Sequence, residues 1–240
     1  VKSKEVFPFI EGRARRSAAA QACSSNAPRR ACVLAAAPPG RNSDAVRCMS
    51  SIFFPPALIA ASGSMDGAGK EASVLFIGNS LTFWNKGIFK HIAPLGPFAC
   101  DSETIGGATL RVHIKKGGAM NAISAGHFGR AFNFVVLQDD LPEYASQDEA
   151  RAEFQSLGEK FIAAARTAGA MPVMYMAWPY ARLPGMPLEL IVELHRGLAK
   201  KTGVAVAPVG IAFGLATERA ASVGQSADYL LDHDKEHPSA

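Results

Sequence analysis

The 240-residue sequence predicts an α/β fold for most of its length: a three-layer α/β/α sandwich around a mostly parallel five-stranded sheet. Three observations favour this class. Short apolar runs recur from Glu71 onward, helical patterns separate them, and glycine or polar residues follow several of the runs. Strands that alternate with helices form β-α-β units, which build parallel sheets covered by helices on both faces.

Four of the expected strands are short apolar runs that suit a buried sheet, and the second in chain order is an extended stretch that contains polar residues. In chain order the expected strands are residues 73–78, 98–105, 132–137, 172–177 and 204–207. The expected helices show apolar residues at helical spacing, and they are residues 81–95, 108–126, 147–168 and 188–201. A glycine pair at 117 and 118 should break the second helix, and Gly203 should end the last one.

The first 70 residues differ from the remainder. They are rich in Ala, Ser, Arg and Pro without a sustained period, so disorder is the first expectation. Residues 1–48 hold nine Lys/Arg and three Asp/Glu, a net of +6, whereas residues 49–240 hold sixteen and eighteen, a net of −2. The overall charge of +4 therefore comes from the N-terminal segment, and the domain expected at residues 71–240 has no nucleic-acid footprint.

Two targeting interpretations compete with disorder. Residues 13–47 are rich in Arg, Ala and Ser and poor in acidic residues, as organelle transit peptides are. Alternatively, translation starts at Met49 and the apolar residues 52–60 act as a signal peptide, although two prolines interrupt them. Either would make the protein secreted or organelle-targeted. Because the chain begins with Val1, a fragment, a processed product and a translated upstream region all stay open.

Cysteine content and hydropathy exclude two further classes. Cys100 is the one cysteine after residue 48, so neither an internal disulfide nor a cysteine metal cluster is expected in the main body. A buried structural thiol is the expected role. No apolar run reaches the roughly 18 residues of a transmembrane helix, so no membrane span is expected.

The first expected strand ends in the sequence Gly78-Asn79-Ser80-Leu81-Thr82. Ser80 should therefore lie at the carboxyl edge of the sheet and at the start of a helix, where ligands bind in parallel sheets. Free backbone N–H groups and the helix dipole would stabilise an anionic intermediate there. The alternative is that Ser80 merely caps the helix.

Two other strand ends carry candidate oxyanion donors. Gly106 and Gly107 follow the second strand, and paired glycines let the backbone approach a ligand closely, although a plain turn is the simpler interpretation. Gln138 follows the third strand, where its side-chain amide could donate a hydrogen bond. Asp139 and Asp140 come next and could instead cap the following segment.

A candidate general base lies far along the chain, in Asp234-Lys235-Glu236-His237-Pro238. A catalytic histidine needs a partner that fixes its tautomer, and Asp234 can reach His237 across a tight loop. His233 lacks this context. His91, His113, His127 and His195 show no metal-ligand spacing and are expected to be ordinary surface or helix-end histidines.

Together these blocks resemble the SGNH (GDSL-type) hydrolase superfamily over about residues 72–240. Gly78-Asn79-Ser80-Leu81 resembles the nucleophile block, with Asn79 in place of the usual Asp. Gly107 lies in a block similar to the one whose glycine N–H joins the oxyanion hole, and Asp234-x-x-His237-Pro238 resembles the last block. The third block departs from the usual G-x-N-D, and the branch with V-V-L-Q is closest.

The resemblance implies a flavodoxin-like fold and a serine esterase without metal or organic cofactor. Ser80 would be the nucleophile, with His237 as base and Asp234 as its partner. The oxyanion would be held by the N–H groups of Ser80 and Gly107 and by the Gln138 side chain. The implied substrates are small acyl esters, with O-acetyl groups on carbohydrates as one possibility, and Asn79 and Trp178 are candidate substrate contacts.

Alternatives remain open at this point. An acyltransferase could use the same triad if water were excluded, and a ligand-binding domain could keep the fold without catalysis. Members of the family usually continue through a further helix after the last block, whereas this chain stops three residues after His237. The domain therefore looks truncated at its C-terminus, and we expect the His237 loop to be mobile.

Overall fold

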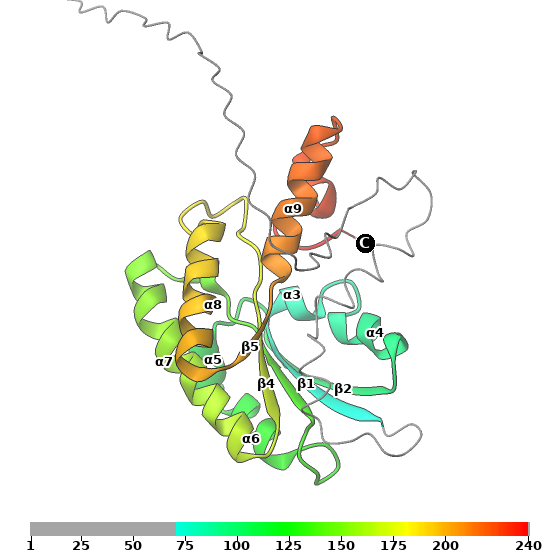
Figure 1. Ribbon diagram of the computed structural model, residues 1–240, viewed down its shortest axis with the longest axis vertical. Coiled ribbons are helices and arrows are strands. Elements are labelled where there is room, and N and C mark those ends of the chain that lie inside the picture. The colour runs from blue at the N-terminus through cyan, green and yellow to red at the C-terminus, as the bar shows by residue number, and fades with distance from the viewer. Residues whose placement is uncertain (1–70, 240) are drawn as a thin grey trace, which may run out of the picture. The chain divides into compact units, whose positions relative to one another are not determined.

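Five parallel strands form a single sheet in the computed structural model, which describes residues 71–239 (Figure 1). Their spatial order is β2-β1-β3-β4-β5. The strands are β1 (Ala72–Gly78), β2 (Phe98–Thr104), β3 (Phe134–Leu137), β4 (Met171–Tyr175) and β5 (Ala205–Ala207). The predicted α/β class is confirmed, with every strand parallel. The expectations for residues 1–70, including disorder and targeting, lie outside the described residues.

The strand order reverses at β1, and this reversal defines where a ligand can bind. The chain passes from β1 to β2 on one side and then returns to place β3 on the other side of β1. The connections after β1 and after β3 therefore diverge at the carboxyl edge of the sheet. In open parallel sheets such a switch point is the usual ligand site.

Alternate residues of the central strands point to opposite faces and pack against different helices. Leu75, Ile77 and Leu137 belong to the larger core, which also contains buried residues of α5 (Leu110–Lys116), α6 (Gly118–Ala125), α7 (Gln147–Thr167) and α8 (Leu188–Thr202). On the other face, Phe76 contacts Phe89 of α4 (Ile88–Ile92), and Val136 packs beside residues of α3 (Ser80–Phe83) and α9 (Val209–Ser222). Three layers result.

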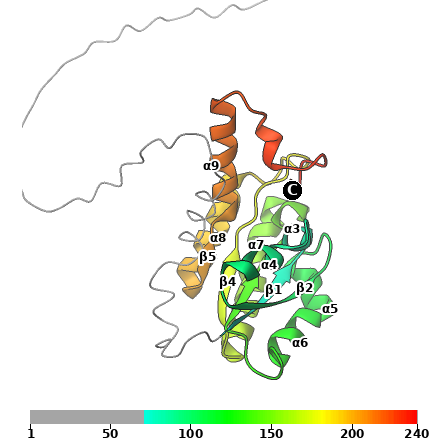
Figure 2. The same ribbon diagram turned by 90° about the vertical axis from the view of Figure 1, so that its right-hand side faces the viewer.

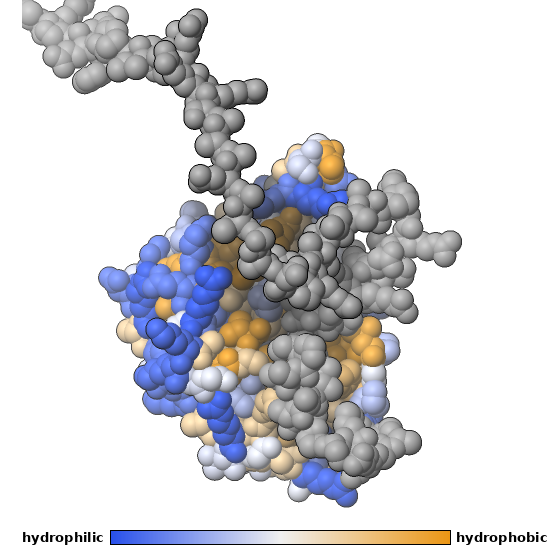
Figure 3. Space-filling view, in the orientation of Figure 1, coloured by the Kyte–Doolittle hydropathy of each residue, from blue (hydrophilic) through white to orange (hydrophobic). Residues whose placement is uncertain are grey.

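Charged residues cover the outer faces of α7 and α8, which form the blue surface in Figure 3. Arg151 pairs with Glu193 and Lys201 pairs with Glu159, so ion pairs tie the two helices together across their exposed sides. Their inner faces supply large buried residues such as Phe154, which is fully buried. None of the helices within residues 71–239 combines the length and apolarity needed to cross a bilayer.

Two segments differ from the sequence-based expectation. The predicted helix at residues 81–95 is divided into α3, α4 and the 3₁₀ helix η1 (Ala93–Leu95), because Asn85, Lys86 and Gly87 all have positive φ angles of 49°, 73° and 83°. Two further helices, α9 and the 3₁₀ helix η3 (Ala227–Leu230), were not predicted from the sequence. Most residues of α9 itself are alanine, glycine or larger apolar residues. The helix therefore lacks the single apolar stripe by which amphipathic helices are recognised.

The start of α9 lies against the end of β4 at a glycine. Gly210 donates from its N–H to Met176 O at 2.8 Å, and a Cβ added there would lie 2.2 Å from the backbone oxygen of Ala177. We expect Gly210→Ala to lower the free energy of unfolding by about 1–3 kcal/mol, because backbone atoms must move apart. Urea denaturation measures this.

Gly197 provides the matched control, since it also lies inside a helix but nothing would lie within 4 Å of an added Cβ. Gly197→Ala should raise the free energy of unfolding by about 0.5–1 kcal/mol, because alanine is the better helix former. Equal effects of the two substitutions would contradict the close packing of α9 on β4.

Candidate active site

Ser80 is the first residue of α3, directly beyond the carboxyl end of β1. Asn79 is the N-cap, and its Oδ1 accepts a hydrogen bond from Leu81 N at 2.9 Å. Ser80 itself is 9% exposed, and among the described residues no acceptor pairs with its backbone N–H. The turn needs glycine at position 78, because an added Cβ would lie 2.3 Å from Thr82 Oγ1. The nucleophile candidate Ser80 therefore lies on a tightly packed backbone turn, and its own backbone N–H is free to donate.

Asp234 and His237 form a directly bonded pair. Asp234 Oδ2 lies 2.6 Å from His237 Nδ1, while Oδ1 accepts hydrogen bonds from the backbone N–H groups of Glu236 and His237, both at 3.0 Å. Burial alone would raise the pKa of Asp234, but these hydrogen bonds outweigh it and lower the pKa to about 2. An ionised Asp234 assigns the imidazole proton to Nδ1 and leaves Nε2 as the basic nitrogen.

Trp84 connects the histidine to the serine. Its ring stacks on the His237 ring with centroids 4.0 Å apart and an interplanar angle of 21°. Trp84 follows Ser80 by one helical turn, and the backbone N–H of Trp84 donates to the backbone oxygen of Ser80 at 2.7 Å. His237 therefore lies beside the start of α3, and in Figures 1 and 2 the red C-terminal segment lies at the edge of the sheet where α3 begins.

The structure does not join His237 to Ser80 by a hydrogen bond. His237 Nε2 is buried and pairs with no described residue, and Glu236 Oε1 lies 3.9 Å away from it. Nucleophile–base hydrogen bonds are often long in enzymes without a bound ligand. The Asp234–His237 pair is thus fully formed, and Trp84 connects it to the turn of α3 that begins at Ser80.

Gly107 presents a second free N–H near the serine. Its φ angle of 63° lies in the left-handed region, which glycine adopts without strain. The turn is closed by a hydrogen bond from Ala108 N to Ile105 O, and Ile105 N donates to Gly78 O at 3.1 Å. Within the described part of the chain no acceptor pairs with Gly107 N. The ends of β1 and β2 are therefore tied together, with the Gly107 N–H available for an oxyanion.

Gln138 is a brace beneath the serine turn, which differs from its expected role as an oxyanion donor. Its Oε1 accepts from Asn79 N at 2.8 Å and from Thr82 Oγ1 at 3.0 Å, and its Nε2 donates to Asp139 O at 2.9 Å. The side chain is 1% exposed. Because Asn79 N can only donate, the amide oxygen must face the serine turn. Its geometry therefore fixes the nucleophile turn to the end of β3.

Two expected substrate contacts are also buried. Asn79 is fully buried and serves as the cap of α3. Trp178 is 3% exposed, donates from Nε1 to Glu236 O at 2.8 Å and stacks on Phe213 at 4.0 Å. Both side chains therefore make intramolecular contacts with most or all of their surface. Trp178 instead supports the loop that carries His237.

Asp139 and Asp140 are buried next to each other at the end of β3, and we call this pair the floor of the site. Neither was predicted from the sequence to be a site residue. Asp139 accepts hydrogen bonds from Leu110 N at 2.8 Å, Asp140 N at 2.9 Å and Tyr144 OH at 3.0 Å. Burial raises its pKa to about 6, although these three donors oppose the rise. The carboxylate thus holds the start of α5, the helix that follows Gly107.

Asp140 holds the segment between β4 and α8, as Asp139 holds the start of α5. Its Oδ1 accepts from Tyr180 OH at 2.6 Å. Burial raises the pKa of Asp140 to about 7, Glu143 and Asp139 add to the rise, and Tyr180 and the neighbouring Asn79 side chain oppose it. Asn79 Nδ2 nevertheless makes no hydrogen bond of good geometry with the described residues. Two successive acidic residues directly after an apolar strand are the sequence signal for this pair, and capping of the next segment is the other role open to them.

Two of the histidines expected to be ordinary surface or helix-end residues are buried, one of them in the last turn of α5. His113 is fully buried, and its Nε2 lies 3.0 Å from Gly78 O, directly below the serine turn. His195 is 2% exposed, and burial lowers its pKa to about 4. Burial also lowers the pKa of His113, so both rings are neutral at physiological pH. They are structural residues within the α/β core.

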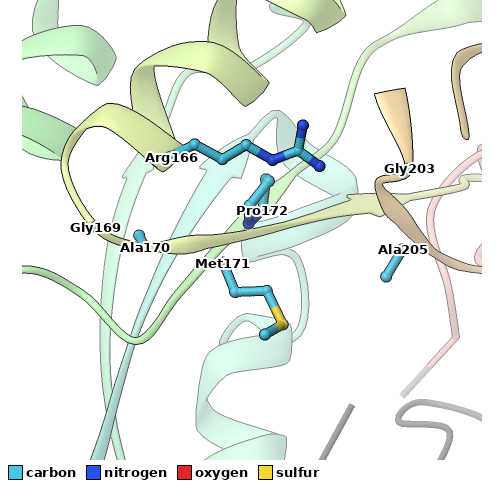
Figure 4. A pocket seen from close by; sticks show the side chains of 7 residues that line it. All are labelled: Arg166, Gly169, Ala170, Met171, Pro172, Gly203 and Ala205. Carbon is cyan, nitrogen blue, oxygen red and sulfur yellow. The ribbon is translucent and has the colours of Figure 1, made fainter. Parts of the chain in front are cut away.

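An open hollow of about 450 Å³ lies at the opposite edge of the sheet, where β4 and β5 begin (Figure 4). It is lined by Arg166, Gly169, Ala170, Met171, Pro172, Gly203 and Ala205. Arg166 Nη2 already donates to Thr202 O at 2.9 Å. With no nucleophile or base among these residues, the hollow is separate from the chemistry at Ser80.

The described fold is similar to solved structures. An inferred SGNH hydrolase from Slackia heliotrinireducens matches with a TM-score of 0.56 and 28% identity, over 71% of this chain and 91% of that chain. The protein YxiM from Bacillus subtilis gives 0.54 and 14%, over 72% and 53%, and TesA gives 0.51 and 17%, over 70% and 89%. The last two comparisons concern the fold alone. No model of a protein family and no curated protein matches the chain.

The resemblance inferred from the sequence is thereby confirmed at the level of the superfamily. The described part of the chain has a five-stranded parallel α/β fold and is similar to an SGNH hydrolase over most of that protein's length.

The buried carboxyl of Asp140 should make stability depend on pH. Its folded pKa of about 7 exceeds the ordinary value of 3.8, so the folded protein keeps a proton that the unfolded chain releases. Stability from this group is present below about pH 4 and is lost as the pH rises through about 7. Asp140→Asn should therefore show a smaller fall in the free energy of unfolding than wild type between about pH 5 and about pH 8.

Urea denaturation at the two pH values measures the difference. Asp148→Asn is the control, because Asp148 is exposed in the first turn of α7 and should follow the wild-type profile. Parallel profiles for wild type and Asp140→Asn would contradict a raised pKa at this position.

Proposed function

We propose that the protein is a serine esterase that hydrolyses small acyl esters through Ser80, His237 and Asp234. The observation that carries the proposal is the Asp234–His237 pair stacked on Trp84, one helical turn beyond Ser80. The same three residue types in these roles recur on unrelated folds. O-acetyl groups on carbohydrates are the substrates that fit the family resemblance.

The reaction follows as acyl transfer in two steps. His237 Nε2 takes the proton of Ser80 as Oγ attacks the ester carbonyl, and Asp234 stabilises the imidazolium that forms. The N–H groups of Ser80 and Gly107 stabilise the oxyanion. The tetrahedral intermediate collapses when His237 donates its proton to the leaving alcohol. Water then repeats the sequence on the acyl-enzyme and releases the carboxylic acid and free Ser80.

A ligand-binding domain without catalysis is the second candidate. The unpaired His237 Nε2 favours it, because a base that stays apart from the serine cannot take its proton. A fluorophosphonate probe separates the two. An esterase should be labelled at Ser80, as peptide mass analysis would show, whereas a binding domain should remain unlabelled.

Ser80→Ala should reduce hydrolysis of p-nitrophenyl acetate by at least about 1,000-fold, because the acyl-enzyme can no longer form. The rate of p-nitrophenol release measures this directly. Ser124→Ala is the control, since Ser124 is exposed on α6 and its hydroxyl donates only to Met120 O among the described residues. Equal rates in wild type and Ser80→Ala would rule out Ser80 as the nucleophile.

A further inference from the structure

The segment that carries His237 is a folded loop, which we call the base loop and define as residues 229–239. Leu231 and Pro238 form an antiparallel bridge across it, and Asp232 N donates to His237 O at 2.7 Å. Ser239 N donates to Leu230 O at 2.9 Å. These hydrogen bonds fold the base loop on itself, and its place in the molecule depends on the residues that contact it.

Arg182 docks the base loop to the neighbouring segment between β4 and α8. Its Nε donates to Glu236 Oε2 in the base loop, and its Nη2 donates to Glu143 Oε1 in the 3₁₀ helix η2 (Leu141–Glu143). The side chain of Glu236 is 12% exposed, whereas that of Arg182 is 42% exposed. A nearly buried carboxylate needs such a partner, because an unpaired buried charge is strongly destabilising.

The same guanidinium also contacts the buried floor of the site. It lies 5.2 Å from the centre of the Tyr180 ring, a distance suited to a cation–π contact, and Tyr180 OH donates to Asp140. Asp140 lies beside Asn79, the residue before the nucleophile. Arg182 therefore links the loop of the proposed base to the turn of the proposed nucleophile.

Glu236 makes the position of Arg182 chemically important. Its other oxygen, Oε1, is already 3.9 Å from His237 Nε2, the nitrogen that must accept the Ser80 proton. A carboxylate released by Arg182 would accept a hydrogen bond from that nitrogen and favour a proton on it. A base protonated at Nε2 in the resting state cannot accept the serine proton.

We propose that Arg182 is a positioning residue for the base His237: it holds the base loop against the floor and keeps Glu236 away from His237 Nε2. The proposal rests on the esterase function proposed above. It predicts that removing the guanidinium lowers kcat while leaving KM nearly unchanged, because Arg182 orients the base without touching the ester.

The two tryptophans of the chain give a readout that does not depend on catalysis. Both contact the base loop: Trp84 stacks on His237, and Trp178 donates to Glu236 O. Displacement of the loop must change the surroundings of both indoles. Intrinsic tryptophan emission therefore reports loop docking even in a protein without measurable activity.

The test compares wild type with Arg182→Met, Arg182→Lys and Arg151→Met in p-nitrophenyl acetate hydrolysis and in tryptophan emission. Arg182→Met should lower kcat by roughly 10- to 100-fold and change the emission, since misplacing a catalytic group by about an ångström costs on the order of 100-fold. Arg182→Lys should recover part of the loss, because a point charge cannot hold two carboxylates in the fixed geometry of a guanidinium.

Arg151 is the matched control. It is also 42% exposed and also pairs with a glutamate, Glu193, but it joins α7 to α8 far from the base loop. Arg151→Met should keep both the wild-type kcat and the wild-type emission. Thermal denaturation of each variant identifies any that fails to fold, and Arg182→Lys then carries the comparison.

The outcomes separate this proposal from the proposed function. A kcat for Arg182→Met within about twofold of wild type, or an equal loss in Arg151→Met, would overturn the positioning role. If wild type shows no hydrolysis that depends on Ser80, the esterase function fails, and emission alone decides whether Arg182 holds the base loop. Unchanged emission in Arg182→Met would then overturn that as well.

Discussion

The burial of two adjacent carboxylates at the end of β3 is the constraint on which the rest of the site depends. Asp139 and Asp140 are 3% and 1% exposed, so each must receive hydrogen bonds to persist in the folded state. Asp139 obtains them from the start of α5 and from Tyr144, and Asp140 from Tyr180. Each carboxylate thus binds donors from a different loop of the site, and both loops contact the end of β3.

The two halves of this floor use the same chemistry. Arg111 lies 5.5 Å from the centre of the Tyr144 ring, whose hydroxyl donates to Asp139, and Arg182 lies over Tyr180, whose hydroxyl donates to Asp140. Each arginine also binds two glutamates. One arrangement stabilises the segment after Gly107, and the other stabilises the base loop. The proposed oxyanion donor Gly107 and the proposed base His237 are therefore held by similar sets of contacts at one strand end.

The sequence predicted the parts of the molecule that local patterns encode. The apolar run before Gly78 and the helical spacing of Phe154 and Phe161 in α7 are properties of neighbouring residues, and both elements formed as expected. The break between α3 and α4 and the apolar helix α9 were not predicted. The positive φ angle of Asn85 depends on tertiary packing, and the small and apolar residues that fill most of α9 give it no periodic signal.

For the site residues too, contacts between near neighbours in the sequence could be predicted, whereas contacts between distant residues could not. Asp234 and His237 are three positions apart, so their pairing could be predicted from the sequence. The bonds of Gln138 to Asn79 and Thr82 join residues 59 and 56 positions apart, and Trp178 meets Glu236 across 58 positions. Such contacts follow from the strand order of the sheet. A sequence motif names the residue, but its partners depend on the complete fold.

The long sequence separation between the nucleophile turn and the base loop has a consequence for how the protein acquires its reactivity during folding. Asn85 Nδ2 donates to Pro238 O at 2.5 Å across 153 positions, whereas the brace on the nucleophile turn spans 59. Contacts of high sequence separation form slowly, and synthesis delivers the base loop after all five strands. In the order of synthesis the five strands and the serine turn precede His237, so in the proposed esterase Ser80 would lack its base until the base loop has docked.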